Sequence, residues 1–321
     1  MKTFKFLIAV LFLSISTLTA QNKLGGKVYF NYSYNKNAAP TNSFEIHRVY
    51  FTLKNNLSKE ISYKVTTDVG RFNTGKDNRL SVYLKNALLA WKTDFGKFVF
   101  GLQGMNLFNV EEHNWGYRFV EKSPMDRHNF SSSADLGIGY YNKFADKVSF
   151  SFLITNGSGY KKSENDNYKK YSVQVLYGKS KISKGGFNLG ASFSLEPFDY
   201  KKGTTTSTEN KTVLGGFAGY SKNNLRFGAE YDVFNEQGVN LTKTIMSAYG
   251  NYKFSKKVEL YARLDLYDPN TSADNDGNTY IIGGLNFTPG KGLSISPNFR
   301  YLKPQTGTPT SVYNVNFQFK I

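Results

Sequence analysis

The final segment of the chain, Tyr313–Ile321, reads YNVNFQFKI and alternates strictly between apolar and polar side chains. Such an alternation predicts a β-strand with one apolar face and one polar face. A chain that ends inside a strand of this kind suits a barrel in which the last strand pairs with the first and leaves no open edge.

The same alternation recurs along the chain, for example at Lys27–Asn35, Phe44–Lys54, Ile61–Gly70 and Val258–Tyr267. We count about sixteen such segments, each long enough for the roughly 9–11 residues of a tilted strand that crosses a bilayer. The sequence therefore predicts an all-β fold, a transmembrane antiparallel β-barrel of about sixteen strands.

The connections between the segments alternate in length. The short ones are Asn55–Ser58, Thr93–Gly96, Phe144–Asp146, Ile182–Gly185, Ser221–Asn223, Phe254–Lys256 and Thr288–Lys291. The long ones are Lys36–Asn42, Arg71–Arg79, Phe108–Ser133, Gly157–Asn167, Phe198–Lys211, Asn235–Leu241, Asp268–Asn278 and Lys303–Thr310. Short and long connections therefore fall at opposite ends, which is typical of outer-membrane barrels with short periplasmic turns. A soluble sandwich, the alternative fold, does not require this asymmetry.

The composition agrees with a barrel. The chain has 23 Tyr, 27 Phe and 29 Gly but only 8 Pro and no Cys, which favours strands and aromatic girdles over a disulfide-stapled secreted scaffold. The mean hydropathy of -0.45 alone would indicate a soluble protein. In a membrane barrel, however, only alternate side chains face lipid, so the average stays hydrophilic.

The first residues, 1–20, have the features of a signal peptide. Lys2 and Lys5 precede the apolar run Phe6–Leu13, and Ala20 offers a small residue at a plausible cleavage point. An uncleaved signal anchor is the alternative, but the run is short for a membrane span. We therefore expect export through a cleaved signal peptide and a single outer-membrane barrel over residues 21–321.

The formal net charge of +17 is compatible with nucleic acid, an anionic lipid surface or a pathway for anions. An exported chain without a basic helix or an RNA-binding aromatic motif gives no reason to expect a nucleic-acid partner. Many lysines lie in turn segments, such as Lys54, Lys147, Lys256 and Lys257. We expect most of them to form a solvated rim near lipid head groups and lipopolysaccharide.

The connection Phe108–Ser133 combines both charge signs with aromatic side chains more densely than any other stretch. A lumen about sixteen strands wide would be open, so a loop folded into it would form a constriction whose fixed charges act on passing solutes. The alternative is a lid or a subunit contact whose charges pair with one another. The candidate constriction residues are Glu111, Glu112, His113, Arg118, Glu121, Lys122, Asp126 and Arg127.

Inward positions of the strands supply a candidate pore wall with both charge signs. Its members are Arg48, Lys64, Asp68, Arg226, Glu230, Arg263, Asp265 and Arg300. Because this balance is only mildly basic, we expect a general diffusion pore with at most a weak anion preference. One segment, Leu80–Trp91, breaks the alternation, and we expect it to lie under another subunit or under the long connection, with both faces covered by protein.

Motifs in the first half of the chain allow a comparison with a known family. They are Phe44–Lys54 (FEIHRVYFTLK), Tyr63–Lys64, Asp68, Gly101, Gln103, Trp115–Phe119 (WGYRF), Glu121–Lys122, Ala134–Gly137 and Thr155–Gly157. Over about residues 44–160 the chain resembles the phosphate-selective porin O and P family and its relatives in the Bacteroidetes. The resemblance implies a trimeric outer-membrane porin whose third external loop folds into the lumen and whose basic residues line an anion path. Arg118, Glu121 and Lys122 fall in the loop motif, and Arg48 and Lys64 fall on early wall strands.

A barrel enzyme is one alternative function. The histidines are His47, His113 and His128, and the chain contains no Gly-x-Ser-x-Gly, HExxH or phosphate-binding loop motif. His113 or His128 could form a triad with Asp126 and Ser131–Ser133 only if folding brought these groups together. His47 shares the parity of apolar strand positions, which favours a place in an aromatic girdle. We therefore predict that the protein is not an enzyme.

A structural or adhesive barrel with an occluded lumen is the other alternative. Asp274–Gly277 resembles a fragment of a calcium loop but lacks the later bidentate glutamate, so we expect a polar loop tip and no metal or cofactor. The sequence favours a porin that passes small hydrophilic or anionic solutes without energy coupling, and the resemblance implies a homotrimer.

Overall fold

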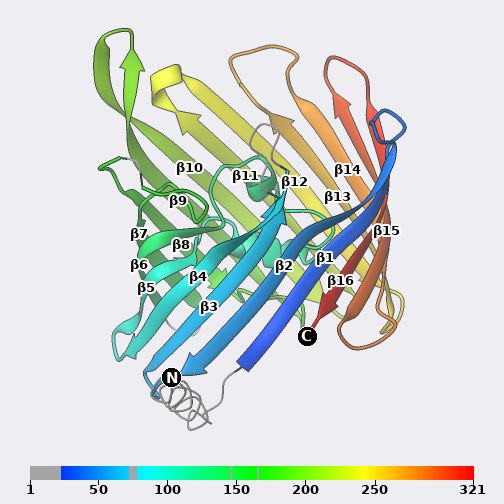
Figure 1. The fold of residues 1–321 in the computed structure, drawn as a ribbon, viewed down its shortest axis with the longest axis horizontal. Helices are drawn as coiled ribbons and strands as arrows, with labels where there is room; N and C mark the ends of the chain where they lie inside the picture. The colour runs from blue at the N-terminus through cyan, green and yellow to red at the C-terminus, as the bar shows by residue number, and fades with distance from the viewer. Residues whose placement is uncertain (1–22, 72–77, 145–146, 165) are drawn as a thin grey trace, which may run out of the picture.

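Sixteen antiparallel strands form one closed barrel (Figure 1). The structure is a computed structural model that describes residues 23–71, 78–144, 147–164 and 166–321. Each strand pairs with the next along the chain, and β16 pairs with β1. The predicted all-β antiparallel barrel is therefore confirmed. The signal peptide expected over residues 1–20 lies outside the described residues.

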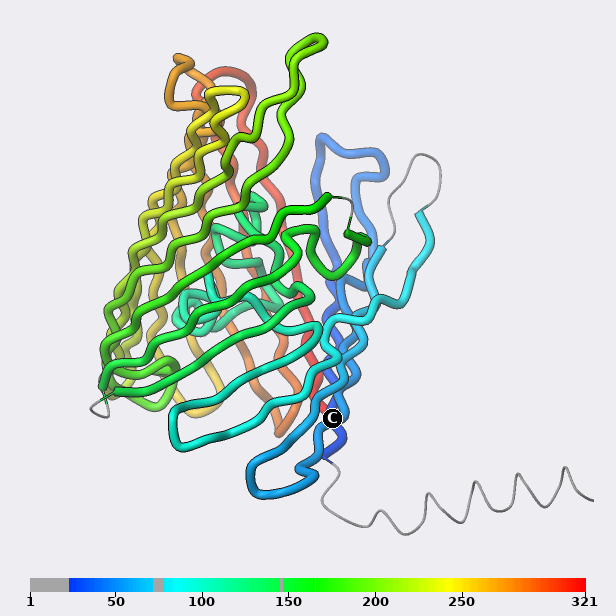
Figure 2. Tube along the Cα trace, turned by 90° about the vertical axis from the view of Figure 1, so that its left-hand side faces the viewer, coloured from blue at the N-terminus to red at the C-terminus, as the bar shows by residue number. Residues whose placement is uncertain are grey.

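The strands vary in length around the barrel. The first eight are β1 (Lys23–Tyr34), β2 (Asn42–Asn56), β3 (Ile61–Arg71), β4 (Leu80–Thr93), β5 (Gly96–Gly104), β6 (Ala134–Phe144), β7 (Val148–Thr155) and β8 (Lys170–Gly178). The others are β9 (Gly186–Lys202), β10 (Thr205–Lys222), β11 (Leu225–Glu236), β12 (Leu241–Lys253), β13 (Val258–Asp268), β14 (Asn278–Phe287), β15 (Leu293–Pro304) and β16 (Thr310–Lys320). The hairpin of β9 and β10 rises above its neighbours (Figure 2).

Alternation sorts side chains between the two faces of the barrel wall. On β16, Tyr313 is 56% exposed on the outside, whereas Asn316 is fully buried inside. Asn316 accepts a hydrogen bond from Asn298 of β15 at 2.8 Å. The closing seam pairs β1 with β16 over eight positions. The outer face is therefore apolar, and neighbouring strands satisfy one another's backbone groups around the closed barrel, as a lipid phase requires.

A β-bulge explains why Leu80–Trp91 shows no simple alternation. The register between β3 and β4 shifts at one point, where Lys85 is an extra residue. Such an insertion reverses the parity of the strand. Even positions such as Val82 are exposed on the outer face before the bulge, and odd positions such as Trp91 are exposed after it. The broken pattern comes from an inserted residue, so two covered faces are not needed to explain it. A second bulge inserts His47 into β2.

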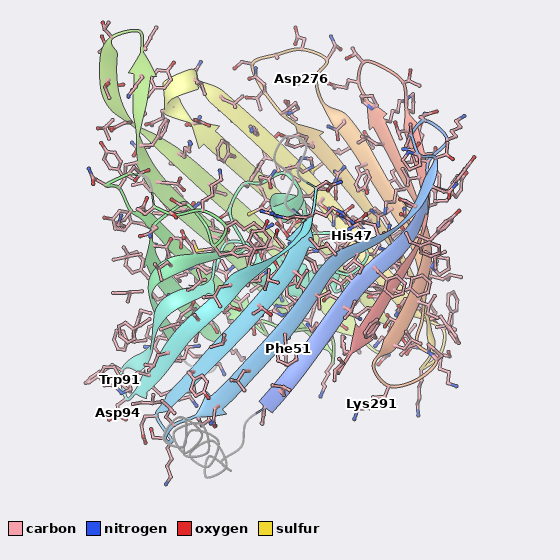
Figure 3. The ribbon with its side chains drawn as sticks, viewed as in Figure 1. His47, Phe51, Trp91, Asp94, Asp276 and Lys291 are labelled. Atoms are coloured by element: carbon pink, nitrogen blue, oxygen red, sulfur yellow. The ribbon has the colours of Figure 1, made fainter. Side chains whose placement is uncertain are left out.

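Where the structure describes them, short and long connections lie at opposite ends of the barrel, as their alternating lengths predicted. Most of the predicted connections Arg71–Arg79 and Phe144–Asp146 lies outside the described residues. Asp94 and Lys291 mark the short-turn end, and Asp276 marks the long-loop end (Figure 3). The predicted long loop Phe198–Lys211 is wrong, because β9 and β10 continue through it to a tight turn at Gly203–Thr204. Threonines in this segment favour strand pairing. Among the described residues, no helix is long and apolar enough to span a membrane.

Candidate functional site

The connection between β5 and β6, residues 105–133 and here called L3, lies inside the barrel (Figure 1). It contains two short helices, α2 (Asn109–Trp115) and α3 (Pro124–Arg127). The first turn of α2 carries two glutamates, which suit the positive end of a helix. Gly116 ends α2 in the left-handed conformation, with φ of 78°, where a residue without a side chain is favoured.

Aromatic side chains of L3 pack against the inner wall on the side of β12 and β13. Trp115 is 1% exposed and meets the rings of Tyr249 and Tyr261 edge-on. Tyr117 stacks on Tyr261 with ring centroids 4.3 Å apart. Because buried aromatic side chains contribute large apolar areas, these contacts fix L3 on one side of the lumen.

Three arginines of the wall hold L3 by its backbone. Arg226 donates to the carbonyl of Trp115 at 3.2 Å, Arg263 to that of Lys122 at 2.5 Å and Arg300 to that of Val120 at 2.7 Å. Charged donors make strong hydrogen bonds and satisfy carbonyls that the irregular loop leaves unpaired. The three arginines face inward, as the alternation predicted, but they are engaged with L3 rather than with the open lumen.

Glu121 anchors L3 by its side chain. The carboxylate accepts hydrogen bonds from Tyr280 at 2.9 Å and from Arg300 at 3.2 Å. Burial alone would raise the pKa of this carboxyl, but Arg300, Arg263 and Arg127 outweigh burial and lower the pKa to about 2. Glu121 is therefore ionised near neutral pH and holds L3 to β14 and β15.

The edge of L3 that faces the lumen carries a connected set of charges. Arg118 lies 3.1 Å from Glu112 and 3.3 Å from Asp126, and Lys122 lies 3.5 Å from Asp126. Partly exposed pairs of this kind contribute little to stability, but they fix where the charges stand. The guanidinium carbon of Arg127 instead lies 3.6 Å from the centroid of the Tyr280 ring on β14.

The wall opposite L3, formed by β2, β3 and β4, is basic. Arg48 pairs with Asp68 at 3.2 Å, and Asp68 also accepts a hydrogen bond from Tyr160 at 2.7 Å. Lys85 places Nζ 5.1 Å from the ring centroid of Tyr50 and 5.4 Å from that of Tyr160. Asp68 is thus engaged by two partners, whereas the ammonium of Lys85 stands among aromatic rings at the lumen.

Two cavities remain open between L3 and this wall. One of about 400 Å³ lies toward the long-loop end, and its basic lining residues are Arg48, Lys85, Arg118, Lys122, Lys161 and Lys162. The other, about 700 Å³, lies toward the short-turn end, and its basic lining residues are Lys23, Lys27, Lys54, Lys64, Lys85, Arg118 and Lys320. The acidic residues that line them are Asp126 and Glu112, both paired with Arg118. The two cavities meet at Lys85, Arg118 and Ser133.

Several lysines of this path are absent from the predicted pore wall, among them Lys27, Lys54 and Lys85. Lys27 and Lys54 line the larger cavity and share the parity of the inward residues Tyr29 and Tyr50, so the alternation contained a signal for them. Lys54, expected in the solvated rim, instead lines the larger cavity. No such signal existed for Lys85, because the bulge hides the parity of its strand.

Glu230 and Asp265 lie beneath L3, not on the open pore wall where we expected them. Glu111 of α2 and Asp232 of β11 join them in a group of carboxyls that are each at most 3% exposed. Arg263 binds both oxygens of Asp265, at 2.7 and 2.5 Å. Because L3 covers these acids, the open cavities are more basic than the balance of inward residues suggests.

The histidines do not form a triad with their neighbours. His128 stacks on Tyr267 with ring centroids 3.6 Å apart. Burial and the adjacent guanidinium of Arg127 lower the pKa of His128 to about 4. Asp126, the acid of the alternative triad, pairs with cations of L3. Within the described residues 105–133, no hydrogen bond joins the imidazole of His113 or His128 to the side chain of Asp126 or to those of Ser131–Ser133.

A closed barrel with a charged loop inside its lumen defines a membrane-spanning barrel of the porin class. A model of the Gram-negative porin family matches residues 8–318, so the chain belongs to this family and is an outer-membrane porin. A search of curated proteins gives no significant match.

Several solved structures share the fold at low sequence identity. The anion-selective porin from Comamonas acidovorans has a TM-score of 0.66 and 14% identity, covering 94% of this chain and 99% of that one. OmpT of Vibrio cholerae in its trimer form has the same TM-score, identity and coverage of 94% and 99%. OprB of Pseudomonas putida has a TM-score of 0.69 and 10% identity, covering 94% of each chain.

Proposed function

We propose that this porin is a passive channel for small hydrophilic solutes, that it prefers anions, phosphate-like anions included, and that L3 sets its constriction. The observation that carries the proposal is the charge around the two cavities. Cations line both, and the acids that border the path, Glu112, Asp126 and Asp68, are each paired with a cation. A positive potential in a narrow lumen raises the local concentration of anions.

The comparisons support two finer parts of the proposal. The Comamonas porin is described as anion-selective, and the Vibrio OmpT structure is described as a trimer. The resemblance of residues 44–160 to phosphate-selective porins points the same way. We therefore include in the proposal a homotrimer that contacts outer-membrane lipid and lipopolysaccharide, with preference set by the field of the lumen and not by an enzymatic site.

The reversal potential of the refolded protein in a planar bilayer under a potassium chloride gradient tests the proposal. We expect discrete current steps and a reversal potential whose sign shows that chloride is more permeant than potassium. The double variant Arg118→Glu and Lys122→Glu should shift the potential toward cations, because two positive charges at the constriction become negative. Lys291→Glu reverses one positive charge in a turn at the short-turn end, outside the constriction, and should leave the potential close to that of the unmodified protein.

The other possible results of these measurements contradict particular parts of the proposal. Current steps with no potential, or with a cation-signed one, would contradict the anion preference but keep the channel. No steps from a folded barrel would contradict the channel and favour a structural or adhesive barrel with an occluded lumen. A hydrolytic activity that is lost in His113→Ala or His128→Ala would favour a barrel enzyme.

A further inference from the structure

L3 rests on β11 through carboxyls that the proposed channel does not use. Glu111 of α2 faces Glu230 and Asp232 of β11, and all three side chains are at most 3% exposed. Their carboxyl oxygens have no hydrogen-bond partner among the described residues. A buried carboxylate without a partner is strongly unfavourable. Three of them side by side therefore cannot all be ionised while L3 is in this position.

The neighbouring elements supply little positive charge to this group. Arg263 of β13 faces it, but its guanidinium already binds both oxygens of Asp265 and donates to a carbonyl of L3. On β12, the hydroxyl of Tyr249 lies 3.5 Å from the backbone carbonyl of Glu111 and not against a carboxyl. Glu121 adds a further negative charge near Arg263. Protons are therefore the available means of neutralising the three acids.

We propose that Glu111, Glu230 and Asp232 form a proton-dependent latch, which holds L3 against β11 when protonated and releases it when the three carboxyls ionise. A protonated carboxyl donates a hydrogen bond to its neighbour, whereas adjacent carboxylates repel one another. The backbone bonds from the wall arginines remain in both states and still hold the end of α2 at Trp115, so ionisation first loosens the part of α2 around Glu111. Proton binding then controls how firmly the constriction is held.

The direction of the pH effect follows from the docked state of Glu111. Burial and the nearby Glu230 raise the pKa of Glu111 above its ordinary value. A carboxyl that binds its proton more tightly when docked stabilises docking at acidic pH. Docking weakens as the pH rises past the ordinary glutamate pKa of about 4.3, and it weakens no further above the raised pKa.

An engineered thiol can report the latch, because the chain contains no cysteine. Val110→Cys is suitable, since Val110 is 2% exposed on α2 and packs with Leu176 and Phe217. Its labelling rate in the refolded barrel is measured from about pH 5 to about pH 9, relative to Lys291→Cys in a turn, which corrects for thiol ionisation. We expect the relative rate to rise by up to about tenfold per pH unit for each proton released.

Two variants in the same background separate the latch from other pH effects. Glu111→Gln combined with Glu230→Gln keeps the side-chain shapes and should flatten the profile. Glu236 lies on β11, as Glu230 does, but its carboxylate pairs with Lys211 at 3.5 Å outside the latch. Glu236→Gln should therefore leave the dependence of the labelling rate on pH unchanged. Folding of each variant is checked by its heat-modifiable mobility on a gel.

The proposal is overturned if the relative labelling rate of Val110→Cys does not change with pH while Glu111, Glu230 and Asp232 are intact. It is also overturned if the rate changes as steeply with pH in the double glutamine variant as it does without these substitutions. A shift of the profile by added calcium at constant ionic strength would also overturn it, because a bound cation would then balance the carboxyls. Labelling needs no current, so the latch and the proposed channel can fail separately.

Discussion

Lys85 shows how one inserted residue can set the charge of a lumen. It is the extra residue of the bulge in β4, and it borders both cavities together with Arg118. Leu84, the residue before it, is exposed on the outer face, whereas Asn86, the residue after it, is buried on the inner face. The bulge therefore adds a cation to the inner face without exposing it to lipid.

The substitution Lys85→Glu should weaken or reverse the anion preference, because a positive charge between L3 and the wall becomes negative. Lys85→Gln should shift the reversal potential about half as far, since it only removes the charge. Both are measured in a planar bilayer under a potassium chloride gradient. Lys256→Glu, in a short turn, serves as the control. A potential unchanged in Lys85→Glu would place the anion path elsewhere in the lumen.

At the scale of elements, L3 determines how much of the lumen is free. Removing residues 110–128 deletes most of α2 and all of α3, so single-channel conductance should rise. The wall arginines would also lose their carbonyl partners, so this barrel should unfold at lower denaturant concentration. Shortening the β13–β14 loop within residues 270–276 is the control. Unchanged conductance after removal of 110–128 would mean that L3 does not constrict the path.

The alternation of apolar and polar side chains predicted some strands and loops of the barrel but not others. Strand faces and connection lengths are local patterns, so Tyr313–Ile321 and most other strands were predictable. The extension of β9 and β10 was not, because Phe198–Lys211 is polar and becomes strand only through pairing between the two segments. The burial of Glu230 and Asp265 was not predictable either, since it depends on where L3 docks, far along the chain.

On the scale of the whole molecule, the barrel has two different sides. The three arginines and most of the buried aromatic rings that hold L3 lie on strands between β11 and β15, whereas β1 to β4 supply five of the lysines that line the open cavities, Lys23, Lys27, Lys54, Lys64 and Lys85. A closed barrel permits this division, because its backbone hydrogen bonds are complete whatever side chains face inward. Selectivity and loop anchoring can therefore vary independently on the two sides.

Closure of β16 on β1 makes stability depend on the outer face of the seam. Val315 lies in the middle of β16, between Tyr32 of β1 and Pro297 of β15. Val315→Arg should lower the free energy of unfolding by about 2–4 kcal/mol, the cost of a cationic side chain near the middle of the bilayer. Ser311→Arg, on the same face near the end of the strand, should cost only about 0–1 kcal/mol. Urea unfolding in lipid vesicles measures both, and equal costs would mean that this face of β16 does not cross the hydrocarbon.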